Sequence, residues 1–229
     1  MKVLMVLLIL VSLLQSCVVS FDYYMLSEMW PPGYCVDKSC DVARQSKLSM
    51  FIIHGLWPQN APSCKPSVLG DFKDPKLVNE LDKKWPSITR QTNQRFWQGE
   101  WDKHGSCSML DAQEYFKLTL ELYDRADIKK ILKKNNITAE VTLKSFPKEE
   151  IENAIKPHIE NTKPQLVCIQ GNLAEVRLCF DKTPDYKYIN CPASSTCPNL
   201  PEKIKFPYLY PNPKPDDPMD PEEGAIPPL

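Results

Sequence analysis

Ile53-His54-Gly55-Leu56-Trp57-Pro58 is one of two short segments that decide how this chain is read. The other lies further along and runs Phe96-Trp97-Gln98-Gly99-Glu100-Trp101-Asp102-Lys103-His104-Gly105-Ser106-Cys107. The chain contains three histidines, and these segments hold two of them, His54 and His104. The second segment also places a carboxylate, Glu100, and an ammonium group, Lys103, beside its imidazole. These side chains are therefore the first candidates for a functional site.

The first segment closes a predicted strand. Residues 49–54 are mostly β-branched or aromatic, and Gly55 and Pro58 follow them, which is typical of a short buried strand. We therefore expect His54 at the end of a strand, at the rim of a sheet.

The second segment lies in a predicted helix. Residues 90–104 read as a helix, and a glycine follows as a stop signal. At about 100° per residue, Glu100, Lys103 and His104 fall within an arc of roughly 100°. One helical face is therefore expected to present an acid, an ammonium group and an imidazole together.

The rest of the chain places strands near both ends and helices in the middle. Strands are predicted over residues 21–29, 165–170, 173–181 and 186–190, with Gly171-Asn172 as a hairpin turn between the second and third. Helices are predicted within 72–84, over 111–134, and after Ser145, which is a plausible N-cap. This order predicts an α+β fold, with an antiparallel sheet packed against several helices.

The two ends of the chain are expected to lie outside this domain. Residues 1–20 have a basic start, an apolar run and small or apolar residues near Ser20, which predicts a secretory signal peptide rather than a membrane span. Residues 207–229 are acidic and rich in proline, which predicts a disordered tail. The folded domain is then 21–206, in a secreted or vacuolar protein.

The cysteines fit an oxidising compartment. Cys17 leaves with the signal peptide, so an even number remains, and four stabilising disulfides are favoured over a metal site. The remaining cysteines are Cys35, Cys40, Cys64, Cys107, Cys168, Cys179, Cys191 and Cys197. A bridge between Cys64 and Cys107 would hold the His54 strand close to the helix. The sequon Asn136-Ile137-Thr138 is a candidate glycosylation site.

The charge balance argues against a strongly basic surface. The net charge is −1, and the acidic tail accounts for much of the negative charge, which leaves residues 21–206 slightly positive. Tight, salt-sensitive binding to long nucleic acid is not expected from this balance. A cleft that handles one or two phosphates remains compatible with it.

Two imidazoles, a carboxylate and a lysine are the groups that RNA cleavage by transesterification needs. A base takes the proton of the ribose 2′-hydroxyl, an acid protonates the departing 5′-oxygen, and a cation stabilises the phosphorane. Histidine suits both proton roles because its ordinary pKa of about 6.5 leaves both forms populated near neutrality. DNA lacks the 2′-hydroxyl and would be spared.

The remaining aromatic and histidine residues have simpler interpretations. Trp57, Trp97 and Trp101 are read as packing residues first, although Trp57 and Trp97 are also candidates for substrate binding. His158 is read as a hydrogen-bonded core residue.

With these residues in view, the chain resembles the ribonuclease T2 family. Residues 51–58 and 96–107 are similar to the two active-site signatures of that family, and the resemblance extends over 21–206, including Trp30-Pro31-Pro32 and the cysteine layout. The resemblance implies an α+β fold and an endoribonuclease that acts on single-stranded RNA without metal or cofactor. Its products would be 2′,3′-cyclic phosphates and then 3′-phosphates.

The resemblance also assigns roles by position. His104 would be the general base, His54 the general acid, and Glu100 and Lys103 would stabilise the transition state. The implied disulfides are Cys35–Cys40, Cys64–Cys107, Cys168–Cys197 and Cys179–Cys191.

Two positions depart from the family pattern. Gly99 stands where many members have a histidine that helps to hold the phosphate, and Met29 stands where plant relatives often have a base-reading glutamine. Turnover and base preference are therefore expected to differ from those relatives.

Three functions remain open at this point. The first is a plant S-like enzyme of phosphate salvage or defence, acting as a monomer and away from membranes. The second is a stylar self-incompatibility ribonuclease, and the third is a silent storage or binding protein on the same scaffold. Retention of both His54 and His104 argues against the silent protein.

Overall fold

The computed structural model describes residues 21–45, 47–62, 64–139, 144–199 and 202–208. The predicted signal peptide and residues 209–229 of the predicted tail lie outside the described residues. Pro207 belongs with the domain, because its carbonyl oxygen accepts a hydrogen bond from Nε1 of Trp30 at 2.7 Å.

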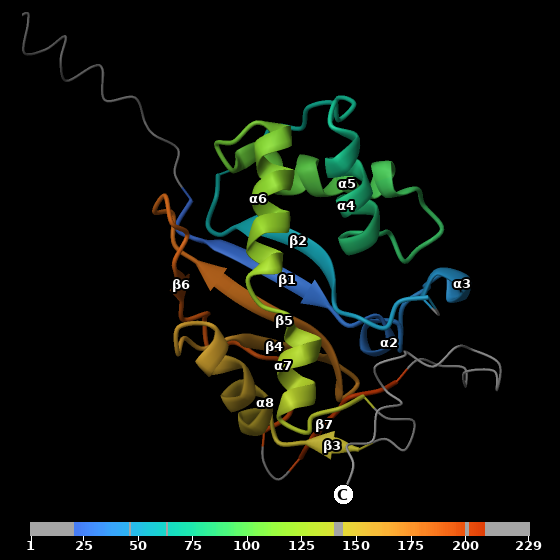
Figure 1. Ribbon diagram of the computed structural model, residues 1–229, viewed down its shortest axis with the longest axis vertical. Helices are drawn as coiled ribbons and strands as arrows, with labels where there is room; N and C mark the ends of the chain where they lie inside the picture. Colours follow the sequence, from blue (N-terminus) through green and yellow to red (C-terminus); the bar gives the residue numbers. More distant parts are fainter. Residues whose placement is uncertain (1–20, 46, 63, 140–143, 200–201, 209–229) are drawn as a thin grey trace, which may run out of the picture.

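One mixed sheet forms the centre of the domain (Figure 1). Its strands are β1 (Tyr24–Met29), β2 (Ile52–Pro58), β3 (Ser145–Phe146), β4 (Gln165–Ile169), β5 (Asn172–Phe180), β6 (Tyr188–Ile189) and β7 (Ile204–Lys205). The order is β2-β1-β5-β7-β3, and β4 and β6 also pair with β5. All pairs are antiparallel except β5 with β7. The predicted α+β class is confirmed.

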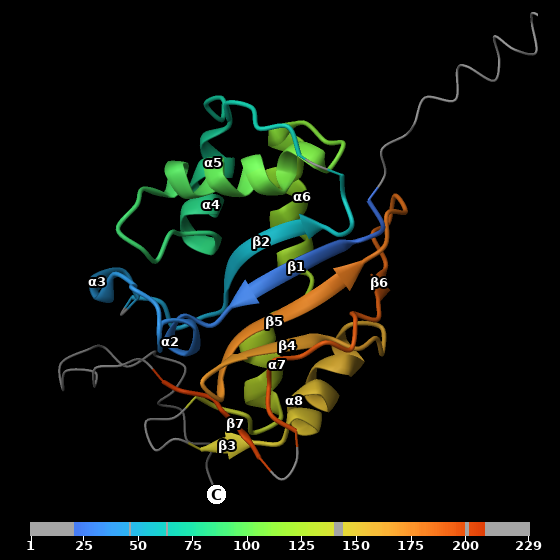
Figure 2. The ribbon, with the colours of Figure 1, turned by 180° about the vertical axis from the view of Figure 1, so that it is seen from behind.

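Helices cover one face of this sheet. The helices among the described residues are α2 (Pro31–Tyr34), α3 (Val42–Gln45), α4 (Pro75–Lys84), α5 (Asn93–Lys103), α6 (Ala112–Asp124), α7 (Ile128–Lys134) and α8 (Lys148–Ile155), with short 3-10 turns at Gly105–Cys107 and Lys156–His158. In Figure 1, α6, α7 and α8 lie in front of the sheet, and α4 and α5 lie beyond β2. Figure 2 shows β1, β2 and β5 from the opposite face, which is open to the viewer. No helix in the described part of the chain is both long and apolar enough to cross a membrane.

Two predicted helical features differ from the structure. The stretch predicted as one helix over 111–134 is two helices, because Asp127 acts as an N-cap and its side chain accepts from the backbone N–H of Lys130. Ser145 is not a helix cap. It pairs with Lys205 in a short strand, and α8 begins only after Pro147.

Strand β2 is longer than the sequence predicts, and His54 lies inside it rather than at its end. Ser27 of β1 pairs with Gly55, whereas Glu28 pairs with Ile53, so His54 is an extra residue in a β-bulge. A bulge interrupts the two-residue alternation of side chains that marks a strand. The sequence pattern therefore predicted that the strand ends at His54, before its observed end.

Aromatic side chains of the core hold the backbone of β2 in this shape. Trp85 donates from Nε1 to the carbonyl oxygen of His54 at 2.9 Å, and Tyr115 donates its hydroxyl to Leu56 at 2.7 Å. Both aromatic side chains are fully buried. The bulge is therefore fixed from the core side of the sheet.

The four disulfides join the pairs that the family resemblance implies. They are Cys35–Cys40, Cys64–Cys107, Cys168–Cys197 and Cys179–Cys191. Cys64 follows β2 and Cys107 follows α5, so this bridge ties together the two segments that carry His54 and His104.

Candidate active site

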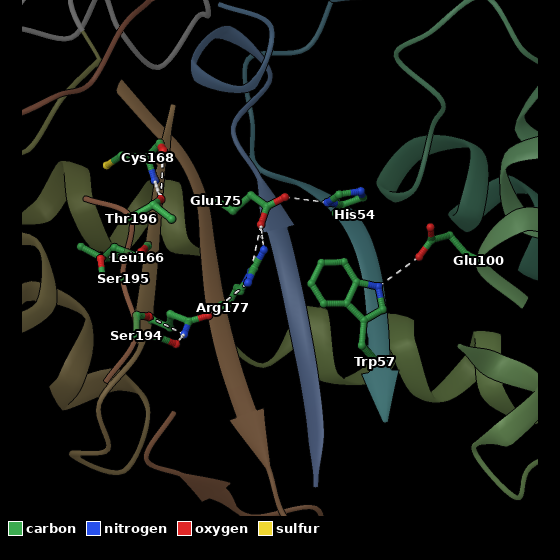
Figure 3. A network of polar contacts seen from close by, with 11 residues as sticks. His54, Trp57, Glu100, Leu166, Cys168, Glu175, Arg177, Ser194, Ser195 and Thr196 are labelled. Atoms are coloured by element: carbon green, nitrogen blue, oxygen red, sulfur yellow. Dashed lines mark hydrogen bonds and ion pairs between the residues drawn. The ribbon is translucent and has the colours of Figure 1, made fainter. Parts of the chain in front are cut away.

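The bulge in β2 turns His54 towards the open face of the sheet. Its side chain is 22% exposed, whereas the nearby Ile53 and Leu56 of the same strand are fully buried. Nδ1 of His54 lies 2.6 Å from Oε1 of Glu175, which projects from β5 across β1 (Figure 3). The carboxylate therefore fixes one nitrogen of the ring and leaves the other for a substrate.

Trp57 contacts both histidines. Its indole centre is 5.2 Å from the His54 ring and 5.5 Å from the His104 ring. Its Nε1 donates to Oε2 of Glu100 at 3.1 Å (Figure 3). The two predicted segments thus meet at one half-buried tryptophan, and the two imidazoles belong to one site.

Glu100 reaches this site because Gly55 has no side chain. A Cβ at Gly55 would lie 2.2 Å from Oε2 of Glu100 and 2.3 Å from Nε1 of Trp57. Glu100 is 6% exposed, and burial raises the pKa of its carboxyl while His54, the Trp57 hydrogen bond and Lys103 oppose the rise. The glycine of the first segment is therefore a requirement of the site.

His104 ends α5 and is half-buried. Burial, the charge of Lys103 and the charge of His54 lower the pKa of His104 to about 4. Its imidazole is therefore neutral at ordinary pH and able to accept a proton. Lys103, the last residue of α5, is exposed, and its positive charge acts on His104.

Glu175 and Arg177 belong to the site, and the sequence interpretation missed both. Burial alone would raise the pKa of Glu175, but its hydrogen bond to His54, the charge of His54 and the ion pair with Arg177 lower it to about 2. A signal was present in the sequence, because two charged residues stand at alternate positions of an otherwise largely apolar strand. Such residues face the same side of a sheet.

A small pocket borders His54 on the side of α2. Tyr34 of this helix contacts the imidazole edge-on, with ring centres 5.5 Å apart. The pocket is lined by Tyr34, His54, Ser87, Thr89, Gln91 and Phe96, together with Met29, Pro86 and Ile88. It combines an aromatic ring with hydroxyl and amide groups, as a site for a flat polar ring requires.

Two of the predicted roles differ in the structure, those of Trp97 and His158. Trp97, a candidate for substrate binding, is 1% exposed and donates from Nε1 to the carbonyl oxygen of Trp85, so it packs in the core. Trp101 is also buried, in agreement with its packing role. His158 is exposed in a 3-10 turn and is not a core residue. Asn136, the candidate glycosylation site, is exposed after α7.

Acidic, cysteine and histidine side chains do not gather into a metal centre within the described residues. The polar groups of the site are instead arranged in pairs: His54 with Glu175, Glu175 with Arg177, and Trp57 with Glu100.

Comparison with known proteins places this arrangement among ribonucleases. Residues 21–191 match the profile of the Ribonuclease T2 family. Ribonuclease S-2 of Nicotiana alata is 31% identical over 201 residues, covering 82% of this chain and 90% of the relative. The crystal structure of the self-incompatibility SF11-RNase of Nicotiana alata superposes with a TM-score of 0.69 at 28% identity, covering 82% of this chain and all of that one. The crystal structure of RNase NT in complex with 5′-AMP gives a TM-score of 0.70 at 30% identity, covering 82% and 98%.

Proposed function

Because the chain belongs to the ribonuclease T2 family, we propose that it is an endoribonuclease that cleaves single-stranded RNA by transesterification. The products are 2′,3′-cyclic phosphates, which are then hydrolysed to 3′-phosphates, and no metal ion takes part. The observation that carries this proposal is the pair of imidazoles that both contact Trp57.

The two histidines are suited to opposite proton roles. His104, with its pKa lowered to about 4, is neutral and takes the proton of the 2′-hydroxyl. His54 has the carboxylate of Glu175 at Nδ1, which holds the ring with its other nitrogen towards the substrate, and donates a proton to the departing 5′-oxygen. Lys103 stabilises the negative charge that develops on the phosphorane oxygens. Glu100, whose pKa is raised by burial, donates a hydrogen bond to one of these oxygens in its protonated form.

The pocket beside His54 is suited to the leaving nucleoside. His54 protonates the 5′-oxygen of that nucleoside, so the base attached to it lies next to the same imidazole. Phe96 offers a ring for stacking, and Ser87, Thr89 and Gln91 offer hydrogen-bonding groups. Met29 lines this pocket in place of the glutamine of many plant relatives, which supports an altered base preference.

Gly99 supports the expectation of altered turnover. A Cβ at this position would meet no atom within 4 Å, so the space that a histidine fills in many relatives is open here. Glycine supplies no phosphate-binding group at this position, so substrate binding relies on the remaining groups.

We infer further that the protein is secreted or vacuolar, that residues 1–20 are its signal peptide, and that residues 21–208 act as a monomer on RNA but not on DNA. The four disulfides support an oxidising compartment. The exposed Asn136 supports glycosylation there. The near-neutral charge of the core favours an S-like role, and transcripts confined to the style would favour self-incompatibility instead.

RNA digestion with each histidine replaced in turn tests the proposed function. The protein should digest yeast RNA at pH 5 to 7 in buffer with a chelator. His54→Ala and His104→Ala should each lower the rate by about 10²–10⁴-fold. His158→Ala is the matched control, because His158 is exposed and lies outside the site.

The same experiment separates the enzyme from a silent storage or binding protein. No digestion by the unmutated, folded protein would establish the silent protein. Digestion that persists in both His54→Ala and His104→Ala would overturn the assigned roles.

A further inference from the structure

Glu175 has both carboxylate oxygens engaged although its side chain is only 4% exposed. Oε1 lies 2.6 Å from Nδ1 of His54, and Oε2 accepts from Nε and Nη2 of Arg177 at 2.9 and 2.7 Å (Figure 3). A buried carboxylate is costly unless it is paired and hydrogen-bonded. Glu175 can therefore remain charged at this buried position because His54 and Arg177 bind its two oxygens.

Arg177 is itself held at two further points. Its Nη1 donates to Oε1 of Gln165 at 3.1 Å, and its guanidinium lies 5.0 Å from the centre of the Trp57 ring. Across the sheet, Arg177 pairs with Ser27, and Ser27 pairs with Gly55. These two small residues leave room above β1 for the long side chain to reach Trp57.

The contacts form one chain across the site. It runs from Glu175 through Arg177 to Trp57 and then to Glu100 of α5 (Figure 3). The strand that contains His54 and the helix that ends at His104 are thus both connected to two charged residues of β5.

We propose that Glu175 and Arg177 are positioning residues for proton transfer at His54. Glu175 keeps a proton on Nδ1 and presents Nε2 to the substrate, and Arg177 holds Glu175 in the orientation that meets the ring. The proposal rests on the proposed ribonuclease function and deepens it. It gives the catalytic acid a carboxylate partner, as in other sites where a carboxylate fixes the tautomer of a histidine.

Several other ionisable groups face His54 and must be considered with this pair. Tyr34 approaches from α2, Glu100 from α5, and His104 from the end of α5. Glu175 differs from them because it contacts Nδ1 directly, and its charge therefore acts on the ring at the shortest distance.

Opposite shifts of the pH profile test the pair. Glu175→Gln removes the negative charge beside His54, so kcat/KM should fall about 10- to 100-fold and its alkaline limb should move to lower pH. Arg177→Met removes the opposing positive charge, so the limb should move to higher pH while kcat/KM falls. A purely structural role would lower the amount of folded enzyme without moving the limb in either direction.

Two matched controls accompany these variants. Glu152→Gln removes another buried carboxylate, which pairs with Lys163 at 3.5 Å, and Arg125→Met removes another guanidinium, which lies 5.9 Å from the Phe180 ring centre. Both controls should keep the unmutated pH profile. Coincident profiles for Glu175→Gln and the unmutated enzyme, or limbs that move the same way in both site variants, would overturn the proposal.

A measurement without mutation separates this inference from the proposed function. Nitrogen-15 NMR of the unmutated protein at pH 8 should find the His54 proton on Nδ1, even if the protein digests no RNA. A proton on Nε2 would overturn the assignment of Glu175. A failure to cleave RNA would overturn the enzyme function and leave this geometry to stand on the NMR result.

Discussion

Glu28 and Glu175 are two buried carboxylates on neighbouring strands of one sheet, and they face opposite sides of it. Glu28 pairs with Val176, and Met29 pairs with Glu175, so the alternation of side chains separates the two groups. Glu28 is 1% exposed and its Oε1 has no hydrogen-bond partner among the described residues, whereas both oxygens of Glu175 are bound.

The two carboxyl groups respond to burial in opposite ways. Burial, with Asp127 and Asp124 nearby, raises the pKa of Glu28 well above its ordinary value. His54 and Arg177 more than offset burial for Glu175 and lower its pKa to about 2. Partners, and not depth, therefore decide which buried acid carries a charge. The helix-covered face is therefore the packing face of the sheet, and the open face is the one that holds charged side chains.

Replacing Trp97 of the core and Trp57 of the site should give the largest difference between the two faces of the sheet. Trp97→Ala should lower the free energy of unfolding by about 3–5 kcal/mol, because it empties part of the core. The folded fraction should keep its kcat/KM. Trp57→Ala should instead spare most of the stability and lower kcat/KM, because it removes the ring that contacts both imidazoles. Urea unfolding measures the stability of each variant, and RNA-cleavage kinetics measure kcat/KM. Reduced substrate affinity in a stable Trp97→Ala variant would show that Trp97 binds substrate.

Lys103→Ala tests whether charge on the open face acts on the chemical step. We expect kcat to fall about 10²-fold with a smaller change in KM, because the ammonium group acts mainly on the transition state. The acid limb of the pH profile, expected near pH 4, should move up, since Lys103 helps to lower the pKa of His104. Lys134→Ala, an exposed lysine at the end of α7, is the control. A variant with higher KM and unchanged kcat would show that Lys103 only binds RNA.

Much of this site was visible in the sequence, and the missing part has a physical reason. The cluster of Glu100, Lys103 and His104 follows from helical geometry, which is local and regular. The position of His54 within its strand does not follow from local geometry, because a bulge is fixed by tertiary contacts such as the Trp85 hydrogen bond. Chemical type alone cannot separate a tryptophan of the core from one of the site.

The fold shows the same division between local and long-range information. The hairpin of β4 and β5 was predicted from a turn of two residues, and its strands are observed. Strands β3 and β7 have two residues each and pair with each other from distant parts of the chain, so no local pattern marks them. Glu175 and Arg177 were missed although they are charged residues in a largely apolar strand, because their partner His54 comes from another strand.

Glu28→Gln tests the helix-covered face through the pH dependence of stability. The folded-state pKa of Glu28 is raised, so the unfolded chain releases this proton first as the pH rises. The stability present below the ordinary pKa of 4.5 is therefore lost as the pH climbs towards the folded value. Glu28→Gln should be more stable than the unmutated protein by about 1–2 kcal/mol at pH 8 and similar to it at pH 4.

Glu175→Gln provides the opposite sign for this comparison. The folded pKa of Glu175 is lowered to about 2, so its contribution is present above the ordinary pKa and is lost as the pH falls towards 2. Urea unfolding between pH 3 and pH 8 measures both variants. Parallel stability curves for the two would contradict the division of the sheet into a packing face and a charged face.

The smallest effect is expected where the core meets the C-terminal segment. A chain that ends after Tyr208 should keep the stability and activity of the whole protein, because the contact of Trp30 with Pro207 remains. A chain that ends after Phe206 loses that hydrogen bond and should be less stable by about 0.5–1.5 kcal/mol. Thermal unfolding of the two truncated proteins measures the difference. If both lose the same stability, residues beyond 208 contribute to the packing face and the domain extends further than residue 208.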